Sequence, residues 1–485
     1  MDLAQYARHD GLALADLVRR GEITGAALAQ LAAAAAERVD PVLGAVVETY
    51  ADHQAAGDAA AAIGGPFAGV PLMLKDLFHG DAGRVCENGS RLAEGWVAPV
   101  ASEMVSRLRG GGFAPVGRAT TSEFGVMGTT ETLAQGATCS PWSAGHMAGG
   151  SSGGSAAAVG AGIVPVATAS DGGGSIRIPA SACGVVGLKP SRGRVTWAPS
   201  AGDPLGGWAA HFVVTRSVRD TAVALDLLAG AAAGDPNVAP PAARAYAEEL
   251  AGPDRPLRVA FCHEPWSARA GDPQVQAACE ATAAMLGELG HEVEQARPQF
   301  QWELFLAAMT TIWSADAAHS VDAFAALVGR EPGPENLEGA TFAMVEHGRS
   351  ISAGALLDAV GDVNTIARQV GGFFTGCDVL LTPTLGTLPA PIGRYDPTAS
   401  IAPRDLFASW SDIESFLPVF NATGQPAISL PLHMSEEGLP IGMQFVGRFG
   451  DESTLLALAA QLEQAMPWAL RTPPIHAGAA ASPSA

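Results

Sequence analysis

GGSSGGSAAAVGAGIVPVATASDGGGSIRIPA, residues 149–180, is the stretch that decides the fold. Its first four residues have the composition of a tight loop, and the small residues at 153–161 predict a short helix. The apolar run at 163–170 then predicts a buried strand, because it contains no charge and is bounded by turn residues. Three glycines and Ser175 separate this strand from a second helix, expected over 176–183. This order of elements predicts a layered α/β unit.

The segments before this stretch continue the alternation of helices and strands. Thr24 is a helix-capping residue type, and the alanine-rich segment after it predicts a helix to about residue 38, which Asp40-Pro41 ends. Residues 68–74 predict a short buried strand that stops at Lys75. The next expected elements are a helix at 102–110 and a strand at 113–117. We therefore expect a mixed central sheet that is surrounded by helices.

The segments after it predict a second lobe at about 255–470, which follows a core region at about 65–230. Its expected elements are a strand at 257–261, a helix from Pro273, helices within 301–375, a strand at 377–383 and a hairpin around Glu437-Gly438. We expect the two lobes to form one domain of residues 1–475. The remaining residues, 476–485, are small and polar and are expected to be a disordered tail.

The composition is that of a folded protein and argues against some partners. The 485 residues are 48% apolar and 16% charged, with a formal charge of −21. A nucleic acid or an anionic membrane would need a basic face, so neither is expected as a partner. We find no membrane-spanning run and no secretion signal, so a cytoplasmic enzyme is expected. The six cysteines have neither zinc-ligand nor disulfide spacing, and no metal or cofactor is expected.

The two lysines of the chain are Lys75 and Lys189, whereas the other basic residues are arginines. An amine, unlike a guanidinium, can lose its proton inside a protein. Lys75 follows an apolar strand, so burial there would favour its neutral, basic form. The alternative is a lysine that extends its amine to the surface. We favour a catalytic base at Lys75 and assign no role to Lys189.

The serines of the decisive stretch have several interpretations. A flexible loop is one, and a phosphate-binding loop is another, although no Gly-Lys-Ser/Thr sequence is present. A nucleophile elbow of the G-x-S-x-G type would make Ser152 the nucleophile, but it requires an apolar strand directly before it. The fourth uses the glycines at 172–174, whose N–H groups can converge on an oxyanion beside Ser175. Such a serine needs a base, and no histidine lies in this stretch.

These residues resemble the amidase signature family. The resemblance rests on the glycine-serine loop at 149–154, on Asp171, and on the run from Gly173 to Arg177 before a proline. Ser151 and Ser175 lie 24 residues apart, as in the family's two-serine arrangement. AGVPLMLKD around Lys75, FNATGQPAISLPL and GLPIGMQFVG are similar to further family motifs. The resemblance spans residues 10–467 and implies the amidase signature fold.

Carried over residue by residue, the resemblance implies a Ser-Ser-Lys triad. Ser175 would be the nucleophile, Ser151 would relay a proton from a cis peptide, and Lys75 would be the neutral base. The implied oxyanion hole consists of the backbone of Gly172, Gly173, Gly174 and Ser175. The implied supporting residues are Ser152, Asp171 and Arg177. The reaction would be hydrolysis of an amide C–N bond through an acyl-enzyme.

The substrate expected from the resemblance is a small linear amide or carbamate. The bacterial members that this sequence resembles hydrolyse nylon oligomers, aryl amides or urethanes. The residues expected to contact such substrates are Met127, Trp142, Gly149, Gly150, Phe305 and Trp313. The protein is expected to act as a monomer or homodimer.

Two alternatives remain beside the hydrolase. One is a tRNA-dependent amidotransferase, whose amidase-like chain releases ammonia from glutamine, and the other is an inactive scaffold. The negative charge, and Gly117-Arg118-Ala119-Thr120 where many relatives have Gly-Lys-Thr-Asn, weigh against the amidotransferase. The complete lysine and serine set weighs against the scaffold. A second departure is the third glycine after Asp171, which is expected to loosen the oxyanion loop.

Overall fold

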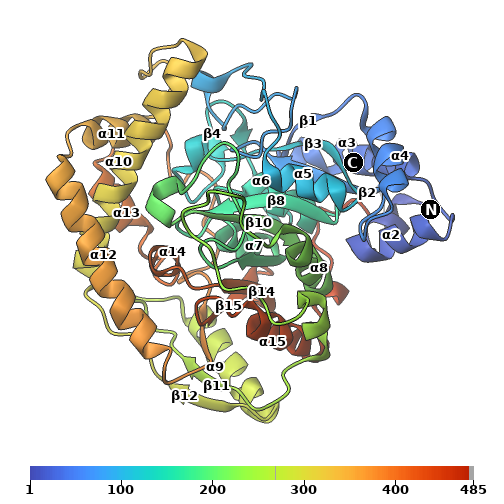
Figure 1. Cartoon of the computed structure of the whole chain (residues 1–485). Helices are drawn as coiled ribbons and strands as arrows, with labels where there is room; N and C mark the ends of the chain where they lie inside the picture. Colours follow the sequence, from blue (N-terminus) through green and yellow to red (C-terminus); the bar gives the residue numbers. More distant parts are fainter. Residues whose placement is uncertain (268, 480–485) are drawn as a thin grey trace.

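The computed structural model describes residues 1–267 and 269–479, and a mixed sheet runs through the middle of the molecule (Figure 1). Its strands, in spatial order, are β1 (Val46–Thr49), β3 (Phe113–Ala119), β2 (Val70–Lys75), β8 (Val166–Asp171), β10 (Ala210–Thr215), β9 (Val186–Lys189), β14 (Ala427–Met434), β15 (Pro440–Gly447), β13 (Val379–Pro383), β11 (Arg258–Phe261) and β12 (Glu292–Gln295). β2 pairs in parallel with β3 and β8, and β11 with β12 and β13, while the other pairs are antiparallel. The predicted mixed sheet is confirmed, and strands from both predicted lobes join it.

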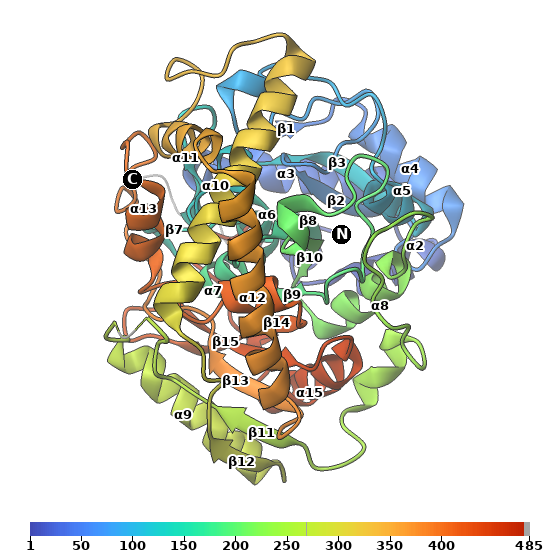
Figure 2. The same cartoon turned by 60° about the vertical axis from the view of Figure 1, so that its left-hand side comes forward.

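Helices surround this sheet. They are α1 (Leu3–Tyr6), α2 (Gly11–Arg19), α3 (Gly25–Leu43), α4 (His53–Ile63), α5 (Glu103–Gly110), α6 (Gly153–Gly160), α7 (Arg177–Cys183), α8 (Val218–Leu228), α9 (Pro273–Glu288), α10 (Trp302–Val328), α11 (Gly339–Arg349), α12 (Ala353–Phe373), α13 (Pro403–Trp410), α14 (Pro418–Thr423) and α15 (Glu452–Ala465). Figure 2 shows α10 and α12, which contact each other, crossing the front of the molecule. Within the described ranges, no helix combines the length and apolarity that a bilayer span requires.

Short elements complete the chain. Two small hairpins pair β4 (Glu131–Thr132) with β5 (Gly136–Ala137) and β6 (Cys139–Ser140) with β7 (Ser143–Met147). The 3-10 turns are η1 (Arg91–Ala93), η2 (Glu123–Gly125), η3 (Pro204–Gly207), η4 (Tyr246–Ala251) and η5 (Trp468–Leu470). The predicted β14–β15 hairpin is confirmed, with Gly438 at a φ of 79° in its turn.

The decisive stretch forms the predicted helix, strand and helix, as α6, β8 and α7. α6 consists of small residues because it packs closely on the segment at 120–130. A Cβ added to Gly153 would lie 2.4 Å from Thr130 Oγ1, and one added to Gly154 would lie 2.3 Å from Thr120 Oγ1. The small residues of α6 therefore allow the chain before β8 to approach β3 and the loop that follows it.

The first long helix differs from its prediction at one end. The Thr24 hydroxyl caps α3 by accepting the Ala27 N–H at 3.1 Å, as predicted, but the helix continues past Pro41. Pro41 lies in the last turn, where the missing N–H costs only one helical hydrogen bond. Gly44, at a φ of 63°, ends the helix instead.

The predicted disordered tail is wrong for its first residues. Ala477 is fully buried, and its N–H donates to the Ala161 carbonyl at 2.8 Å. Residues 476–479 therefore pack against the loop that follows α6, because the small Ala477 side chain fits a buried position. The rest of the predicted tail, 480–485, lies outside the described residues.

Candidate active site

β2 and β8 bring Lys75 to the loops at the centre of the decisive stretch. The two strands are parallel neighbours, so their carboxyl ends lie at the same edge of the sheet. Lys75, at the end of β2, is 1% exposed. Its Nζ lies 2.7 Å from Ser151 Oγ and 2.9 Å from Ser170 Oγ. The amine is therefore held between two hydroxyl groups inside the protein.

Burial determines the protonation of Lys75. Removal from water lowers the pKa of Lys75 well below its ordinary value, and the negative charge of Asp171 only partly opposes this. No carboxylate lies within ion-pair distance of Nζ in the described part of the chain. A neutral amine has a lone pair, so it can accept the Ser151 proton while it donates to Ser170. The geometry and the charge both suit a general base.

Ser151 is fixed by its own main chain. The peptide bond between Gly150 and Ser151 is cis. The Ser151 carbonyl accepts the Thr121 hydroxyl at 2.9 Å, and the Gly149 carbonyl accepts the Thr130 hydroxyl at 2.9 Å. A Cβ on Gly150 would lie 2.6 Å from the backbone of Thr129, so only glycine fits there. The loop at 149–151 is thereby held against 121–130 and presents the Ser151 hydroxyl to Lys75.

Ser175 lies on the glycine loop between β8 and α7. Ser151 and Ser175 both line one cavity of about 100 Å³. Within the described residues, no hydrogen bond joins the two hydroxyls, although both face this space. Gly174 has a φ of 140°, and a Cβ on it would lie 2.8 Å from Leu417 Cδ1. The sharp turn at Gly174 thus orients Ser175 toward the cavity.

The backbone donors of this loop differ from the prediction at one residue. The N–H of Gly174 donates to Asp171 Oδ1 at 2.7 Å, so it is not free to bind an oxyanion. Among the hydrogen bonds between described residues, none uses the N–H of Gly172, Gly173 or Ser175. The predicted oxyanion donors are therefore reduced to these three.

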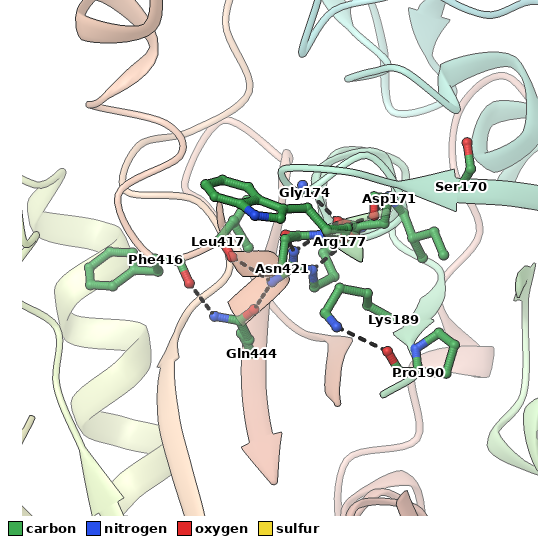
Figure 3. Close-up of polar contacts among 12 residues, drawn as sticks. Ser170, Asp171, Gly174, Arg177, Lys189, Pro190, Phe416, Leu417, Asn421 and Gln444 are labelled. Atoms are coloured by element: carbon green, nitrogen blue, oxygen red, sulfur yellow. Dashed lines mark hydrogen bonds and ion pairs between the residues drawn. The ribbon is translucent and has the colours of Figure 1, made fainter. Parts of the chain in front are cut away.

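Asp171 and Arg177 form a completely buried ion pair beneath the loop (Figure 3). The carboxylate accepts Arg177 Nε and Nη2, both at 2.9 Å, and also the N–H of Ile176 at 3.1 Å. Burial by itself raises the pKa of Asp171, but the charge and hydrogen bonds of Arg177 outweigh it and hold this pKa at about 2. The pair is fully charged near neutral pH and keeps the loop between Asp171 and α7 closed.

Residues of the second lobe form further hydrogen bonds with this ion pair. Arg177 Nη1 donates to the Leu417 carbonyl at 3.1 Å and to Gln444 Oε1 at 2.7 Å. Asn421 accepts Arg177 Nη2 at 2.6 Å and donates to the Asp171 carboxylate at 2.8 Å. Asn421 lies on α14 and Gln444 on β15, so both elements support the glycine loop. Both residues belong to motifs that resemble the family, FNATGQPAISLPL and GLPIGMQFVG, but neither was predicted to have a role.

Ser152 occupies a supporting position and not a reactive one. It is fully buried, and its hydroxyl donates to the Ser170 carbonyl at 3.2 Å and accepts the Ser170 N–H at 3.3 Å. Residues 148–151, directly before it, form a loop, although the segment before them, which the sequence indicated to be a loop as well, contains the β6–β7 hairpin. The nucleophile elbow around Ser152 is therefore excluded. Ser170, which contacts Lys75, was missed although it ends the apolar strand of the decisive stretch.

Trp313 is the predicted substrate contact whose side chain reaches the cavity. Three other side chains lie elsewhere. Trp142 donates through Nε1 to the Cys183 carbonyl at 3.0 Å. Met127 is buried in a hydrophobic cluster formed mainly by residues of the second lobe, and Phe305 is buried against Trp208. None of these three side chains lines the cavity, because packing holds Met127 and Phe305 in the core and the hydrogen bond to Cys183 holds the partly buried Trp142.

The remaining predicted residues lie behind the cavity. Gly149 and Gly150 are buried against Pro179 and Thr129 and do not line the cavity. Lys189, the second lysine, is buried, and its Nζ donates to the Pro190 carbonyl at 3.0 Å. Burial and the charge of Arg177 lower the pKa of Lys189 to about 7. Figure 3 shows its amine directed toward the Pro190 carbonyl.

The divergent stretch at 117–120 also lies away from the cavity. Arg118 forms ion pairs with Glu87 at 2.6 Å and Asp76 at 3.2 Å, and Thr120 shares a hydrogen bond with Thr138. None of these residues lines the cavity. The departure from the commoner Gly-Lys-Thr-Asn sequence thus serves internal ion pairing.

This chain is similar to a known enzyme family over most of its length. Residues 22–456 match the Amidase family. The chain belongs to the amidase family. A 6-aminohexanoate-cyclic-dimer hydrolase from Paenarthrobacter ureafaciens is 38% identical over 476 residues, which cover 96% of each chain. The predicted family is confirmed.

Solved structures of amidases have the same fold. A structure of 6-aminohexanoate cyclic dimer hydrolase matches with a TM-score of 0.91 and 37% identity, covering 97% of this chain and 99% of that one. A bacterial aryl acylamidase of the amidase signature family matches with a TM-score of 0.85 and 26% identity, covering 95% and 96%. The amidase signature fold is confirmed.

The amidotransferase, which was the predicted alternative, has a structure less similar to this chain. The amidase-like chain of the glutamyl-tRNA(Gln) amidotransferase from Thermotoga maritima matches with a TM-score of 0.73 and 27% identity over 91% of each chain. Both hydrolases above have higher TM-scores. The amidase that hydrolyses C–N bonds is therefore favoured over the amidotransferase.

Proposed function

We propose that this amidase acts on small linear amides and carbamates through an acyl-enzyme on Ser175. The observation that carries the proposal is the buried Lys75 amine, which lies 2.7 Å from the hydroxyl of Ser151, a residue that lines the same cavity as Ser175. A neutral lysine, a relaying hydroxyl and a second hydroxyl beside free backbone donors are the parts that acyl transfer requires.

In the first half-reaction, Lys75 takes the proton of Ser151, and Ser151 takes the proton of Ser175. The Ser175 oxygen forms a bond to the carbonyl carbon, and the carbonyl π electrons move to the oxygen. The N–H groups of Gly172, Gly173 and Ser175 are proposed to stabilise this oxyanion. The tetrahedral intermediate collapses when the C–N bond breaks and the Lys75 proton passes through Ser151 to the leaving nitrogen.

In the second half-reaction, water replaces the amine. Lys75, neutral again, accepts through Ser151 a proton from the attacking water, and the C–O bond to Ser175 breaks. The released Ser175 oxygen recovers its proton, and the acid leaves. For a carbamate, the first half-reaction releases the amine, and the second releases a carbonic half-ester that breaks down to an alcohol and carbon dioxide.

The cavity wall supports small apolar acyl or aryl substrates. Its lining combines aromatic and aliphatic side chains, namely Phe78, Phe124, Leu77, Val126, Trp197, Leu205 and Trp313. Apolar walls with few polar groups are typical of small-molecule sites. The names of the related 6-aminohexanoate-cyclic-dimer hydrolases indicate a cyclic amide as their substrate. For this chain we propose open-chain amides as substrates.

The test is hydrolysis of an acyl nitroanilide, an aryl carbamate and glutamine by the wild type and by Ser175→Ala. We expect the wild type to hydrolyse the first two, and the variant to lose activity on both while it still folds. Glutamine hydrolysis alone would contradict the proposal and support an amidotransferase. Activity that survives in Ser175→Ala would reject Ser175 as the nucleophile.

A further inference from the structure

The cavity holds a carboxylate that the proposed mechanism does not use. Asp316 lies on α10, one helical turn after Trp313, and lines the same cavity as Ser151 and Ser175. Residues three apart on a helix project from the same face. Asp316 and Trp313 therefore form one side of the cavity wall.

Asp316 is held in place but has no cationic partner. Its Oδ1 accepts the Leu205 N–H at 3.0 Å, and its Oδ2 accepts the Ser320 hydroxyl at 3.4 Å. No ion pair involving Asp316 occurs among the described residues, and no lysine, arginine or histidine is among the residues that line this cavity. The other acidic residue of the wall, Asp171, is paired with Arg177. Asp316 is thus an oriented carboxylate that faces a space for ligand.

Asp316 lies on the side of the cavity where we expect the acyl part of a substrate. A Cβ on Gly172 would lie 3.1 Å from Leu205 Cδ2 and 3.2 Å from Trp313 Cζ2, so these side chains cover the oxyanion loop. Ser151, which returns the proton to the leaving nitrogen, lies beside Gly125 and not beside Leu205 or Trp313. A Cβ added to Gly125 would lie 3.5 Å from Ser151 Oγ. The leaving group belongs on the Ser151 side, and the acyl chain on the side of Trp313 and Asp316.

We propose that Asp316 forms a subsite for a positively charged amino group on the acyl part of the substrate. This inference rests on the proposed function and names its substrate class: amides of acids that carry a terminal amine several methylene groups from the carbonyl. The apolar wall at Leu205 and Trp313 packs against the methylene chain, and Asp316 accepts hydrogen bonds from the ammonium group. Such charge-assisted bonds in a partly buried site are stronger than neutral ones.

The test compares two substrates that differ at one group. In 6-aminohexanoyl nitroanilide an ammonium group ends the acyl chain, and in heptanoyl nitroanilide a methyl group takes its place. The variant is Asp316→Asn, whose side-chain oxygen can still accept the Leu205 N–H. The matched control is Asp322→Asn, which removes an equal charge from the exposed part of α10, where Asp322 pairs with Arg349.

We expect the wild type to have a higher kcat/KM for the aminohexanoyl substrate than for the heptanoyl one. Asp316→Asn is expected to lower kcat/KM for the aminohexanoyl substrate about 10- to 100-fold while the heptanoyl value stays nearly constant. Asp322→Asn is expected to change neither value substantially. The readout is the ratio of the two values, which a merely structural role of Asp316 would leave unchanged.

The possible outcomes distinguish a failure of the proposed subsite from a failure of the proposed function. An unchanged ratio in Asp316→Asn, or an equal loss for both substrates, would overturn the subsite while the amidase mechanism stands. If the wild type hydrolyses neither of the two anilides, the proposal of open-chain substrates is wrong, and the proposed subsite is wrong with it.

Discussion

Two buried basic side chains of this site, Arg177 and Lys75, have different partners. Arg177 has a carboxylate, two side-chain oxygens and a carbonyl as partners, whereas Lys75 has two hydroxyls. Both side chains are at most 1% exposed. A buried charge is tolerable only when it is paired, so Arg177 stays charged, whereas burial lowers the pKa of Lys75 and favours its neutral form. The difference in partners is what we expect if Arg177 positions the loop and Lys75 acts as the base.

The largest expected effect is the loss of the base. Lys75→Met keeps the apolar stem and removes the amine that accepts the Ser151 proton. We expect kcat to fall about 10²- to 10⁴-fold, as for the removal of a general base, with little change in stability. Steady-state kinetics on an acyl nitroanilide, with a urea unfolding curve, measure both. A variant with near-normal kcat would mean that Lys75 is not the base.

The second largest expected effect is on the stability of the protein and follows from a substitution of Arg177. Arg177→Met leaves the Asp171 carboxylate buried without its partner, so we expect a loss of about 3–5 kcal/mol in the free energy of unfolding. Urea unfolding at neutral pH measures this loss. The double variant Asp171→Asn with Arg177→Met removes the unpaired charge and is the control, and it is expected to recover part of the loss. Equal stability of the single and double variants would contradict the account of the buried pair.

The sequence predicted Lys75 and Ser175 from local signals, whereas the predicted role of Ser151 came from the resemblance to the amidase signature family. Lys75 follows an apolar strand, and Ser151 and Ser175 lie in glycine-rich loops on either side of β8. The order of β strands across both lobes, and the contacts of Asn421 and Gln444, depend on residues more than 200 positions apart. No local pattern encodes such a pairing.

The substrate pocket was harder to predict than the triad for a physical reason. Trp142, Phe305 and Trp313 are all large and apolar, and such residues pack in a core or line a pocket equally well. Of these three, Trp313 alone lines the cavity. Asp316 was missed because a single aspartate in a helix of mixed composition carries no signal by itself.

The smallest effect concerns the second hydroxyl at Lys75. Ser170→Ala removes an oxygen that accepts a hydrogen bond from Nζ at 2.9 Å, and this bond favours the charged amine. We expect kcat to fall roughly 2- to 10-fold, because the amine is less well oriented. We also expect the acid limb of the kcat/KM profile, which reports protonation of Lys75, to move to lower pH.

The sign of this shift follows from the base mechanism. Activity requires neutral Lys75, so kcat/KM rises as the pH increases through the lowered pKa of Lys75 and then reaches a plateau. Without the Ser170 hydroxyl the protonated form loses a stabilising contact, so the plateau begins at a lower pH. Ser155→Ala is the control, because the Ser155 hydroxyl donates to the Thr168 carbonyl and leaves Nζ untouched. A shift to higher pH in Ser170→Ala would mean that Ser170 stabilises the neutral amine, and the difference between the two buried basic side chains would then be assigned to hydrogen bonding as well as to burial.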